Sequence, residues 1–194
     1  MKLLETIKAL DGELFHLEYH QRRLEQSLQK LGFCNSLDLS ALLSPPKEGL
    51  IRCRVIYDEN AAEVTYHPYT PRTFQALQLV IADELDYALK YADRTALTSL
   101  FEQRGSADDV LIVKDSLITD TTVANIAFYE NGRWITPAQP LLHGTTRARL
   151  LDEGLLTEAD IAVTQLERFE KYALMNAMIG FMEIENGIIS PKQG

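Results

Sequence analysis

An apolar strand that turns and returns through a single acid dominates the second half of this 194-residue chain. Residues 109–114 read DVLIVK, Asp115-Ser116 supplies turn chemistry, and the chain comes back over residues 117–128. A short apolar run bounded by turn residues predicts a strand. Asp120 lies in the returning segment, enclosed in the sequence ITDTT. Taken alone, this acid is most simply a turn or cap residue; the alternative is a functional carboxylate.

A lone lysine precedes this pair of strands. Lys90 stands among apolar and aromatic residues in the sequence DYALKYADR, residues 86–94. Burial disfavours the charged form of an amine and so makes it more nucleophilic, and such lysines form Schiff bases with carbonyl compounds. From the residues alone, a structural lysine whose ammonium group reaches water is the more common alternative.

Turn signals and hydrophobic periodicity divide the chain into two predicted domains. We expect an N-terminal α+β domain over residues 1–83 and a C-terminal α/β domain over residues 84–194. The expected strands cover residues 3–10, 13–16, 49–57, 63–67, 77–82, 109–114 and 117–128, with hairpin turns at Asp11-Gly12 and Asn131-Gly132 and a last hairpin that joins 180–184 to 188–189 around Asn186-Gly187. The expected helices cover residues 17–31, 36–43, 95–104 and 164–171, and a further helix follows Gly144 and ends at Gly154.

Composition narrows the classes of partner. The formal net charge of −9 argues against a nucleic acid or an anionic membrane surface, because both require a basic face. No apolar run approaches the roughly 20 residues that span a bilayer, and acids occur too early in MKLLETIKALDGE for a secretory signal. Cys34 and Cys53 have no metal-ligand spacing, so we expect reduced core cysteines in a cytoplasmic protein and no metal site.

Several motifs in order resemble one enzyme family. Lys90 is followed by Asp93-Arg94, then by ITD-x-x-x-A-N-I-x-F, by TP and by PLLHGTTR, while HQRRL precedes them and MNAM follows. Together they resemble the class IV aminotransferases. This is the pyridoxal-phosphate family of fold type IV, which includes branched-chain and D-amino-acid aminotransferases and 4-amino-4-deoxychorismate lyase. The resemblance implies a two-domain α/β (α+β) fold with the cofactor between the domains.

The resemblance also assigns roles to individual residues. It implies that Lys90 binds the pyridoxal phosphate covalently and then moves the α-proton of the substrate. Asp120 would pair with the pyridine nitrogen, although the family usually has a glutamate there. The phosphate would be held by the arginine of HQRRL, by two threonines at the start of a helix, and by a backbone segment near the C-terminus, which are Arg23, Thr145, Thr146, Asn176 and Ala177.

The residues themselves leave alternatives open at these positions. Arg22 and Arg23 are equally compatible with a solvated helix surface. The segment that begins at Gly144 is a favourable phosphate site, since a helix N-terminus exposes N–H groups, but it is also a plain N-cap. Arg147 would help only if its side chain turned back over that cap. Arg52 and Arg54 share one face of a strand and are either solvated or line a pocket for an anionic substrate.

Three functions are compatible with this resemblance. The first is a lyase that converts 4-amino-4-deoxychorismate to 4-aminobenzoate and pyruvate in folate biosynthesis, because KYADR is similar to the K-x-x-N-R of the lyases and MNAM points the same way. The second is an aminotransferase for a small amino acid, of the D-amino-acid or branched-chain type. The third is a non-catalytic module that binds pyridoxal phosphate. We expect a small amino substrate and a homodimer. Family members have an N-terminal segment before the strand that LLETI resembles. This chain starts almost on that strand.

Overall fold

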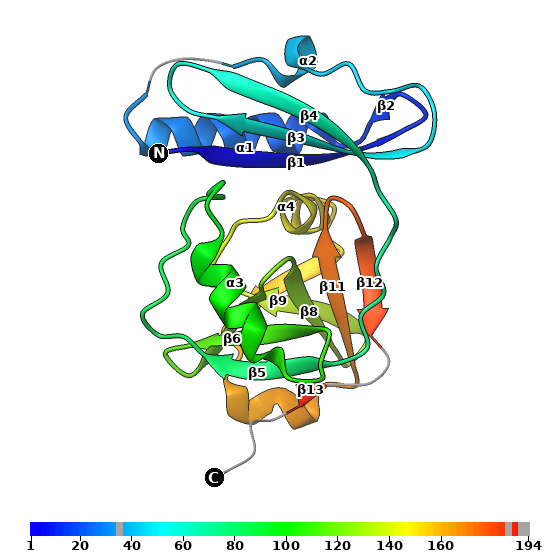
Figure 1. Cartoon of the computed structure of the whole chain (residues 1–194). Helices are drawn as coiled ribbons and strands as arrows, with labels where there is room; N and C mark the ends of the chain where they lie inside the picture. Colours follow the sequence, from blue (N-terminus) through cyan, green and yellow to red (C-terminus); the bar gives the residue numbers. More distant parts are fainter. Residues whose placement is uncertain (34–36, 185–187, 190–194) are drawn as a thin grey trace. The chain divides into compact units, whose positions relative to one another are not determined.

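The computed structural model describes residues 1–33, 37–184 and 188–189, which form two compact units (Figure 1). Unit 1 comprises Met1–Pro71 and Leu89–Asp93, and unit 2 comprises Arg72–Ala88 and Arg94–Gly194. The chain leaves unit 1 after Pro71, earlier than the predicted boundary near residue 83, and the short segment Leu89–Asp93 with Lys90 returns to unit 1. The N–H of Leu4 donates to the carbonyl of Lys90 at 2.8 Å, which fastens that segment to the first strand.

Unit 1 is an antiparallel sheet with two helices. Its strands lie in the order β2-β1-β3-β4, and every neighbouring pair is antiparallel. The buried side chains alternate along β3, so one face of the sheet packs on α1 and forms the core of the unit. The elements are β1 (Leu3–Leu10), β2 (Glu13–Leu14), α1 (Leu17–Lys30), α2 (Leu39–Leu42), β3 (Leu50–Tyr57) and β4 (Ala62–Pro68).

The predicted elements of unit 1 are found with small changes of boundary. Asp11 and Gly12 have φ angles of 50° and 90°, as the tight hairpin predicted there requires. The helix predicted from Ser36 begins at Leu39, and both Ser36 and Cys34 lie outside the described residues. Cys53 is buried and free, and burial raises the pKa of its thiol to about 11.

Unit 2 is built on a nine-stranded mixed sheet. Its strands run in the order β10-β9-β8-β7-β6-β5-β13, and β11 pairs with both β8 and β12. The elements are β5 (Leu77–Ile81), α3 (Thr95–Phe101), the 3-10 helix η1 (Glu102–Arg104), β6 (Asp109–Lys114), β7 (Leu117–Thr121), β8 (Asn125–Glu130), β9 (Arg133–Pro137), α4 (Thr145–Asp152), β10 (Leu156–Ala159), the 3-10 helix η2 (Val163–Arg168), β11 (Lys171–Asn176), β12 (Gly180–Ile184) and β13 (Ile188–Ile189).

Two predictions for unit 2 are corrected, and one strand was missed. The segment expected as one strand over residues 117–128 is two strands, β7 and β8, that pair with each other at Asp120 and Asn125. The last hairpin is wrong: β12 pairs with β11, and β13 pairs in parallel with β5, far away in the sequence. Local turn chemistry cannot reveal such a distant partner. Its predicted turn, Asn186-Gly187, lies outside the described residues. The strand β10 was not predicted.

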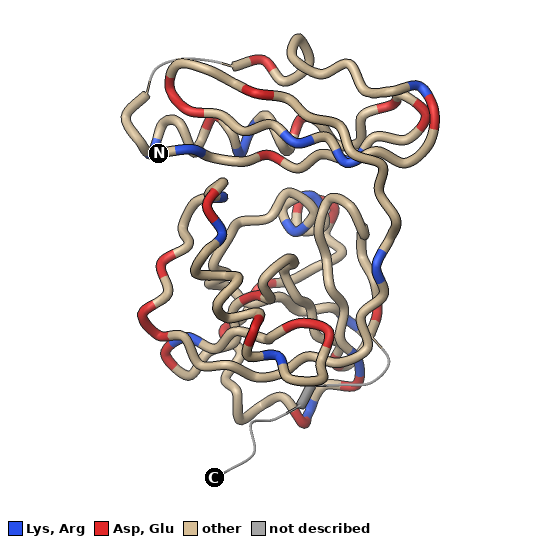
Figure 2. Tube along the Cα trace, in the orientation of Figure 1, with Lys and Arg blue, Asp and Glu red and all other residues tan. Residues whose placement is uncertain are grey.

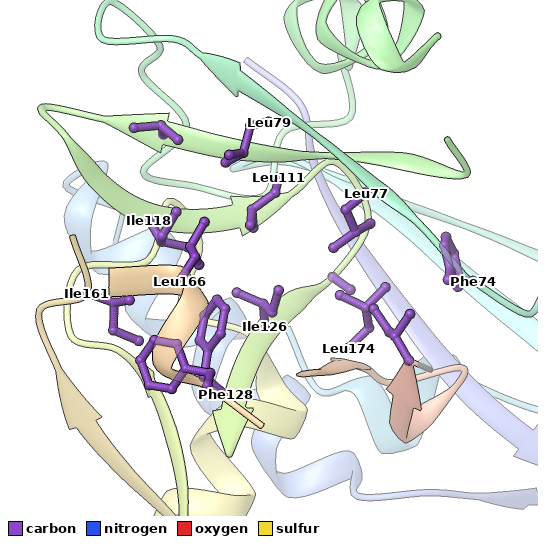
Figure 3. Close-up of a cluster of buried hydrophobic side chains, with 14 residues drawn as sticks. Phe74, Leu77, Leu79, Leu111, Ile118, Ile126, Phe128, Ile161, Leu166 and Leu174 are labelled. Carbon is purple, nitrogen blue, oxygen red and sulfur yellow. The ribbon is translucent and has the colours of Figure 1, made fainter. Parts of the chain in front are cut away.

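The core of unit 2 gathers side chains from strands far apart in the sequence (Figure 3). Ile126 and Phe128 of β8 belong to one cluster with aliphatic residues of β5, β6 and β7. The ring of Phe128 lies 4.8 Å from that of Phe169 and 5.5 Å from that of Tyr172. The strand pair predicted from DVLIVK is therefore central to this core.

Charged residues are interspersed along both units. Figure 2 shows Asp and Glu distributed along both traces, with Lys and Arg among them, so no single acidic segment accounts for the net charge of −9. Among the described residues, no helix has the length and apolar content to cross a membrane.

Two isoleucines of unit 2 test this core. Ile126 is fully buried, whereas Ile81 is 70% exposed. We expect Ile126→Ala to lower the free energy of unfolding by about 2–5 kcal/mol, because it leaves a cavity, and Ile81→Ala to change it by less than about 1 kcal/mol. Urea unfolding followed by the fluorescence of Trp134, the single tryptophan of the chain and part of unit 2, measures both. Equal losses in the two variants would contradict the assignment of Ile126 to the core.

Candidate functional site

A charged cluster is buried in unit 1. Glu5 is on β1 and has no exposed surface, although its neighbours on the same face of the strand, Leu3 and Ile7, belong to the apolar core. The alternation of β1 turns every second side chain toward α1. It therefore places this carboxyl group beneath the helix that carries the HQRRL motif.

Two residues of that motif bind the carboxylate of Glu5. Arg23 donates from Nε to Oε1 at 2.8 Å and from Nη2 to Oε2 at 2.6 Å, a bidentate pair. The Nδ1 atom of His20 lies 2.7 Å from Oε2. An ionised carboxylate can only accept hydrogen bonds, so Nδ1 of His20 is the protonated nitrogen.

Burial and pairing act in opposite directions on these groups. Burial alone raises the pKa of Glu5, but the charge of Arg23 and the hydrogen bonds from His20 and Arg23 outweigh it and hold that pKa at about 2. Burial lowers the pKa of His20 below 6.5, against the effect of Glu5, and the positive charges of Arg23 and Lys90 lower it further. At neutral pH the cluster is therefore a carboxylate, a guanidinium and a neutral imidazole.

Lys90 lies close to this cluster. Its charge acts on His20, and its backbone carbonyl is bonded to β1. On either side of it, Leu89 and Tyr91 pack against the core of unit 1. Of the predicted site residues, unit 1 thus contains Arg23 and Lys90, whose charges both act on His20.

Unit 2 holds a candidate site of its own, around Asp120. This acid is 4% exposed, and each of its carboxylate oxygens accepts a hydrogen bond. Oδ1 accepts from Nδ2 of Asn125 at 2.7 Å, and Oδ2 accepts from the backbone N–H of Leu142 at 2.9 Å. Asp120 is thus a strand residue tied to another part of the chain, and the interpretation as a simple turn residue does not describe it.

The charge of the buried Asp120 carboxylate is only partly compensated by its neighbours. Desolvation raises its pKa to about 7, and the bonds from Leu142 and Asn125 and the charge of Arg147 only partly oppose that effect. A cation placed against this group would restore its ionised form at neutral pH. The site therefore fits a ligand with a positively charged group.

The helix α4 begins close to Asp120 in space, because Leu142, which bonds this acid, lies two residues before the N-cap of the helix. Its N-cap is Gly144, which has no side chain to bond the free N–H groups of the first turn. Thr145 and Thr146 occupy that turn and are buried. These are the features that favour an anion at a helix N-terminus.

Three further arginines were candidates for binding an anionic ligand, and the structure gives a bonded position for one of them, Arg147. Nη2 of Arg147 donates to the carbonyl of Pro137 at 2.8 Å and pairs with Glu158, so this guanidinium is engaged at β9 and β10 and not turned back over the helix cap. Arg52 and Arg54 lie on the face of β3 opposite the core, and contact with substrate stays a prediction for both.

Asn176 has a clear structural role at the end of β11. Its Nδ2 donates to the carbonyl of Val123 at 3.0 Å, and its Oδ1 accepts from the N–H groups of Met178 and Ile179 at 2.9 and 3.0 Å. The side chain thus holds the turn between β7 and β8 and orders the turn that includes Ala177. Any contribution of Asn176 and Ala177 to a phosphate site would come from the backbone.

Sequence reasoning missed Glu5 and Asn125. A signal for Glu5 was present, since an acid at the centre of the alternating pattern LLETIKAL falls on the apolar face of its strand. Asn125 stands in the motif ITD-x-x-x-A-N-I-x-F, but its role is not apparent there, because its partners come from β7 and from the loop before α4. In the described part of the chain, no group of three His, Cys, Asp or Glu residues could hold a metal ion.

Comparison with known sequences places this chain among named relatives. The model of the family described as amino-transferase class IV matches residues 86–186. An uncharacterized protein of Haemophilus influenzae is 35% identical over 92% of this chain and 98% of its own length. A protein of Schizosaccharomyces pombe, provisionally named as an aminodeoxychorismate lyase, is 29% identical over 96% of this chain and 89% of its own length.

Solved structures confirm the predicted fold class. A crystal structure from Haemophilus somnus, provisionally named as a 4-amino-4-deoxychorismate lyase, matches with a TM-score of 0.84 and 34% identity over 92% of this chain and 97% of that one. A provisionally named amino-acid aminotransferase from Mesorhizobium loti matches with a TM-score of 0.82 and 24% identity over 97% of this chain and 99% of that one. At this lower identity the likeness shows the fold alone.

The raised pKa of Asp120 predicts a pH dependence of stability. Its ordinary value is 3.8 and its folded value is about 7, so between these values the folded protein without ligand holds a proton that the unfolded chain releases. Stability from this group is present below pH 4 and is lost as the pH rises through 7. We expect wild type to lose about 2–3 kcal/mol from pH 5 to pH 8 relative to Asp120→Asn, at about 1.4 kcal/mol per pH unit.

Urea unfolding at a series of pH values, with wild type and variant side by side, measures this difference. Groups such as His20 and Glu5 titrate equally in both proteins and cancel. Parallel curves for the two proteins would show that Asp120 is ionised throughout.

Proposed function

The chain belongs to the amino-transferase class IV family, and on this premise we propose that it is a pyridoxal-phosphate enzyme that converts 4-amino-4-deoxychorismate to 4-aminobenzoate and pyruvate. The relatives from Haemophilus somnus and Schizosaccharomyces pombe that bear the lyase name support this substrate. The segment KYADR supports it too, through its similarity to the lysine segment of the lyases.

One observation carries the proposal of the cofactor: the hydrogen bond between Asp120 and the N–H of Leu142. The ring nitrogen and the phosphate of pyridoxal phosphate belong to one small rigid molecule. A site for it must hold a carboxylate and an anion-binding group in a constant spatial relation. Leu142 lies two residues before Gly144, so this bond links the acid directly to the start of α4.

Pyridoxal phosphate, when bound, supplies an electron sink for chemistry at the α-carbon of an amino substrate. The residues of this chain have separate tasks. The ionised Asp120 would keep the ring nitrogen protonated, and the first turn of α4, with Thr145 and Thr146, would hold the phosphate. The family resemblance assigns Arg23 to the phosphate as well, and Glu5 orients its guanidinium. The backbone at Asn176 and Ala177 completes the phosphate site.

Lys90 is the residue that we propose to bind the cofactor and to move protons. A primary amine can act as nucleophile toward the carbonyl group of the cofactor and, once released, as the base and acid at the α-carbon. The buried neighbours on both sides of Lys90 and its backbone bond to β1 limit the positions that its amine can reach. Such restriction favours a defined geometry for proton transfer.

Two features of the proposal are predictions from sequence that the fold leaves open. The protein is proposed to act as a homodimer, because the family resemblance implies that each site borrows residues from the partner subunit. It is also proposed to act in the cytoplasm, as the expected reduced cysteines suggest.

A product assay tests the proposed reaction. The purified protein, saturated with pyridoxal phosphate, is given 4-amino-4-deoxychorismate, and 4-aminobenzoate and pyruvate are measured in equal amounts. We expect both products, and we expect Asp120→Asn to form them at least about 100-fold more slowly, because an unpaired ring nitrogen loses about 3 kcal/mol of stabilisation.

The same assay with pairs of amino acids and 2-oxo acids separates the alternatives. A new amino acid without 4-aminobenzoate would assign an aminotransferase instead. Cofactor binding without turnover of either kind would assign a non-catalytic module.

Reductive labelling tests the assignment of Lys90. Borohydride should attach the cofactor irreversibly to one lysine, and peptide mass spectrometry should find the label on Lys90. Lys90→Arg should abolish the label, while Lys114→Arg, a change at a half-buried lysine that donates to the carbonyl of Leu85, should retain it. Recovery of the label on Lys114 or Lys171 would overturn the assignment.

A further inference from the structure

We propose that Asn125 is a positioning residue that locks Asp120 to the loop before α4, and that position 144 is glycine because the carboxamide of Asn125 occupies the space of its side chain. The inference rests on the proposed function in one respect, that the acid and the helix start hold opposite ends of one cofactor. The lock itself is a property of unit 2 alone.

The first observation is the use of both amide hydrogens of Asn125. Nδ2 donates to Oδ1 of Asp120 at 2.7 Å and to the carbonyl oxygen of Leu142 at 2.8 Å, and the residue is 6% exposed. The reversed orientation of the amide would bring its oxygen against a carboxylate and a carbonyl, both of which only accept. The two partners therefore determine which way the amide points.

The second observation is that Leu142 is held on both sides of its backbone. Its N–H donates to Oδ2 of Asp120, and its carbonyl accepts from Asn125. Asp120 and Asn125 are themselves paired across β7 and β8. Two side chains from adjacent strands thus hold one loop residue through two hydrogen bonds, and a third bond joins the two side chains to each other. That loop leads into α4.

The third observation concerns Gly144. An ideal Cβ at this position would lie 1.9 Å from Oδ1 and 3.1 Å from Cγ of Asn125, which no real side chain tolerates. The backbone of Gly144 has φ −71° and ψ 147°, an ordinary extended conformation that any residue adopts. Glycine is therefore required here by the close approach of Asn125 and not by the backbone conformation.

These contacts have a consequence for a ligand that spans the acid and the helix start. The distance between the carboxylate of Asp120 and the first turn of α4 is set by Leu142 and by Asn125, whose amide touches both the acid and the helix N-cap. Without Asn125, one oxygen of Asp120 and the carbonyl of Leu142 both lose a donor. The helix start would then be free to shift relative to the acid.

A double-mutant cycle on the cofactor-free protein tests the lock. Trp134 fluorescence in urea gives the unfolding equilibrium constant of wild type, Asn125→Ala, Gly144→Ala and the double variant. We expect Gly144→Ala to raise this constant at least about tenfold in wild type but less than about threefold when residue 125 is alanine, because the clash has gone. Equal effects in the two backgrounds would overturn the inference.

A pH profile separates positioning from a purely structural role. The bond from Asn125 lowers the pKa of Asp120, and the charge facing this acid from α4, Arg147, is unchanged in the variants. Asn125→Ala should therefore move the pH-dependent loss of stability to higher pH, whereas Asn60→Ala, at an exposed turn of unit 1, should leave it in place. An unmoved profile in Asn125→Ala would also overturn the inference.

Two further choices keep the test decisive. If Asn125→Ala does not fold, Asn125→Ser replaces it, since a hydroxyl has one proton and cannot serve both partners.

Binding of pyridoxal phosphate and of pyridoxal to the variants is measured in parallel. We expect Asn125→Ala to weaken the former more than the latter, because the helix start shifts; equal weakening would overturn its positioning of the phosphate end. A protein that binds neither would refute the proposed function, while the cycle would still decide whether Asn125 forms the lock.

Discussion

The hydrogen bond from the N–H of Leu142 to the carboxylate of Asp120 is the contact on which the candidate site of unit 2 depends. It joins a strand in the middle of a nine-stranded sheet to the loop that leads into α4. A buried carboxylate is costly to maintain without donors. The donors that stabilise it, Leu142 and Asn125, also hold the loop that leads into α4.

Unit 1 stabilises a buried carboxylate by different partners. Glu5 is as deeply buried as Asp120, yet its pKa is about 2, whereas that of Asp120 is about 7. The difference comes from the partners: Glu5 has a guanidinium and an imidazole N–H, and Asp120 has two neutral donors and a more distant arginine. One acid is already neutralised by its own unit. Among the described residues no cation is bonded to Asp120, so a positively charged ring would stabilise its ionised form, as expected of an acid that binds such a ring.

Local patterns in the sequence were sufficient for most of the framework. The turn at Asp11-Gly12, the helix from Leu17 and the apolar strand before Asp115 all follow from spacing and residue type within a few positions. The pairing of β13 with β5 was not accessible in this way, because parallel partners come from distant parts of the chain. The same limit hid the return of residues 89–93 to β1.

The sequence by itself determined the family and the residue types available for chemistry, because the ordered motifs around Lys90, Asp120 and Thr145 are local strings of letters. Only the tertiary structure decided how those residues are held. Arg23 is bound by Glu5, Arg147 faces Glu158, and Gly144 accommodates the amide of Asn125. Hydrogen bonds and close contacts form between residues that strand pairing brings together, and a linear pattern contains no record of those distances.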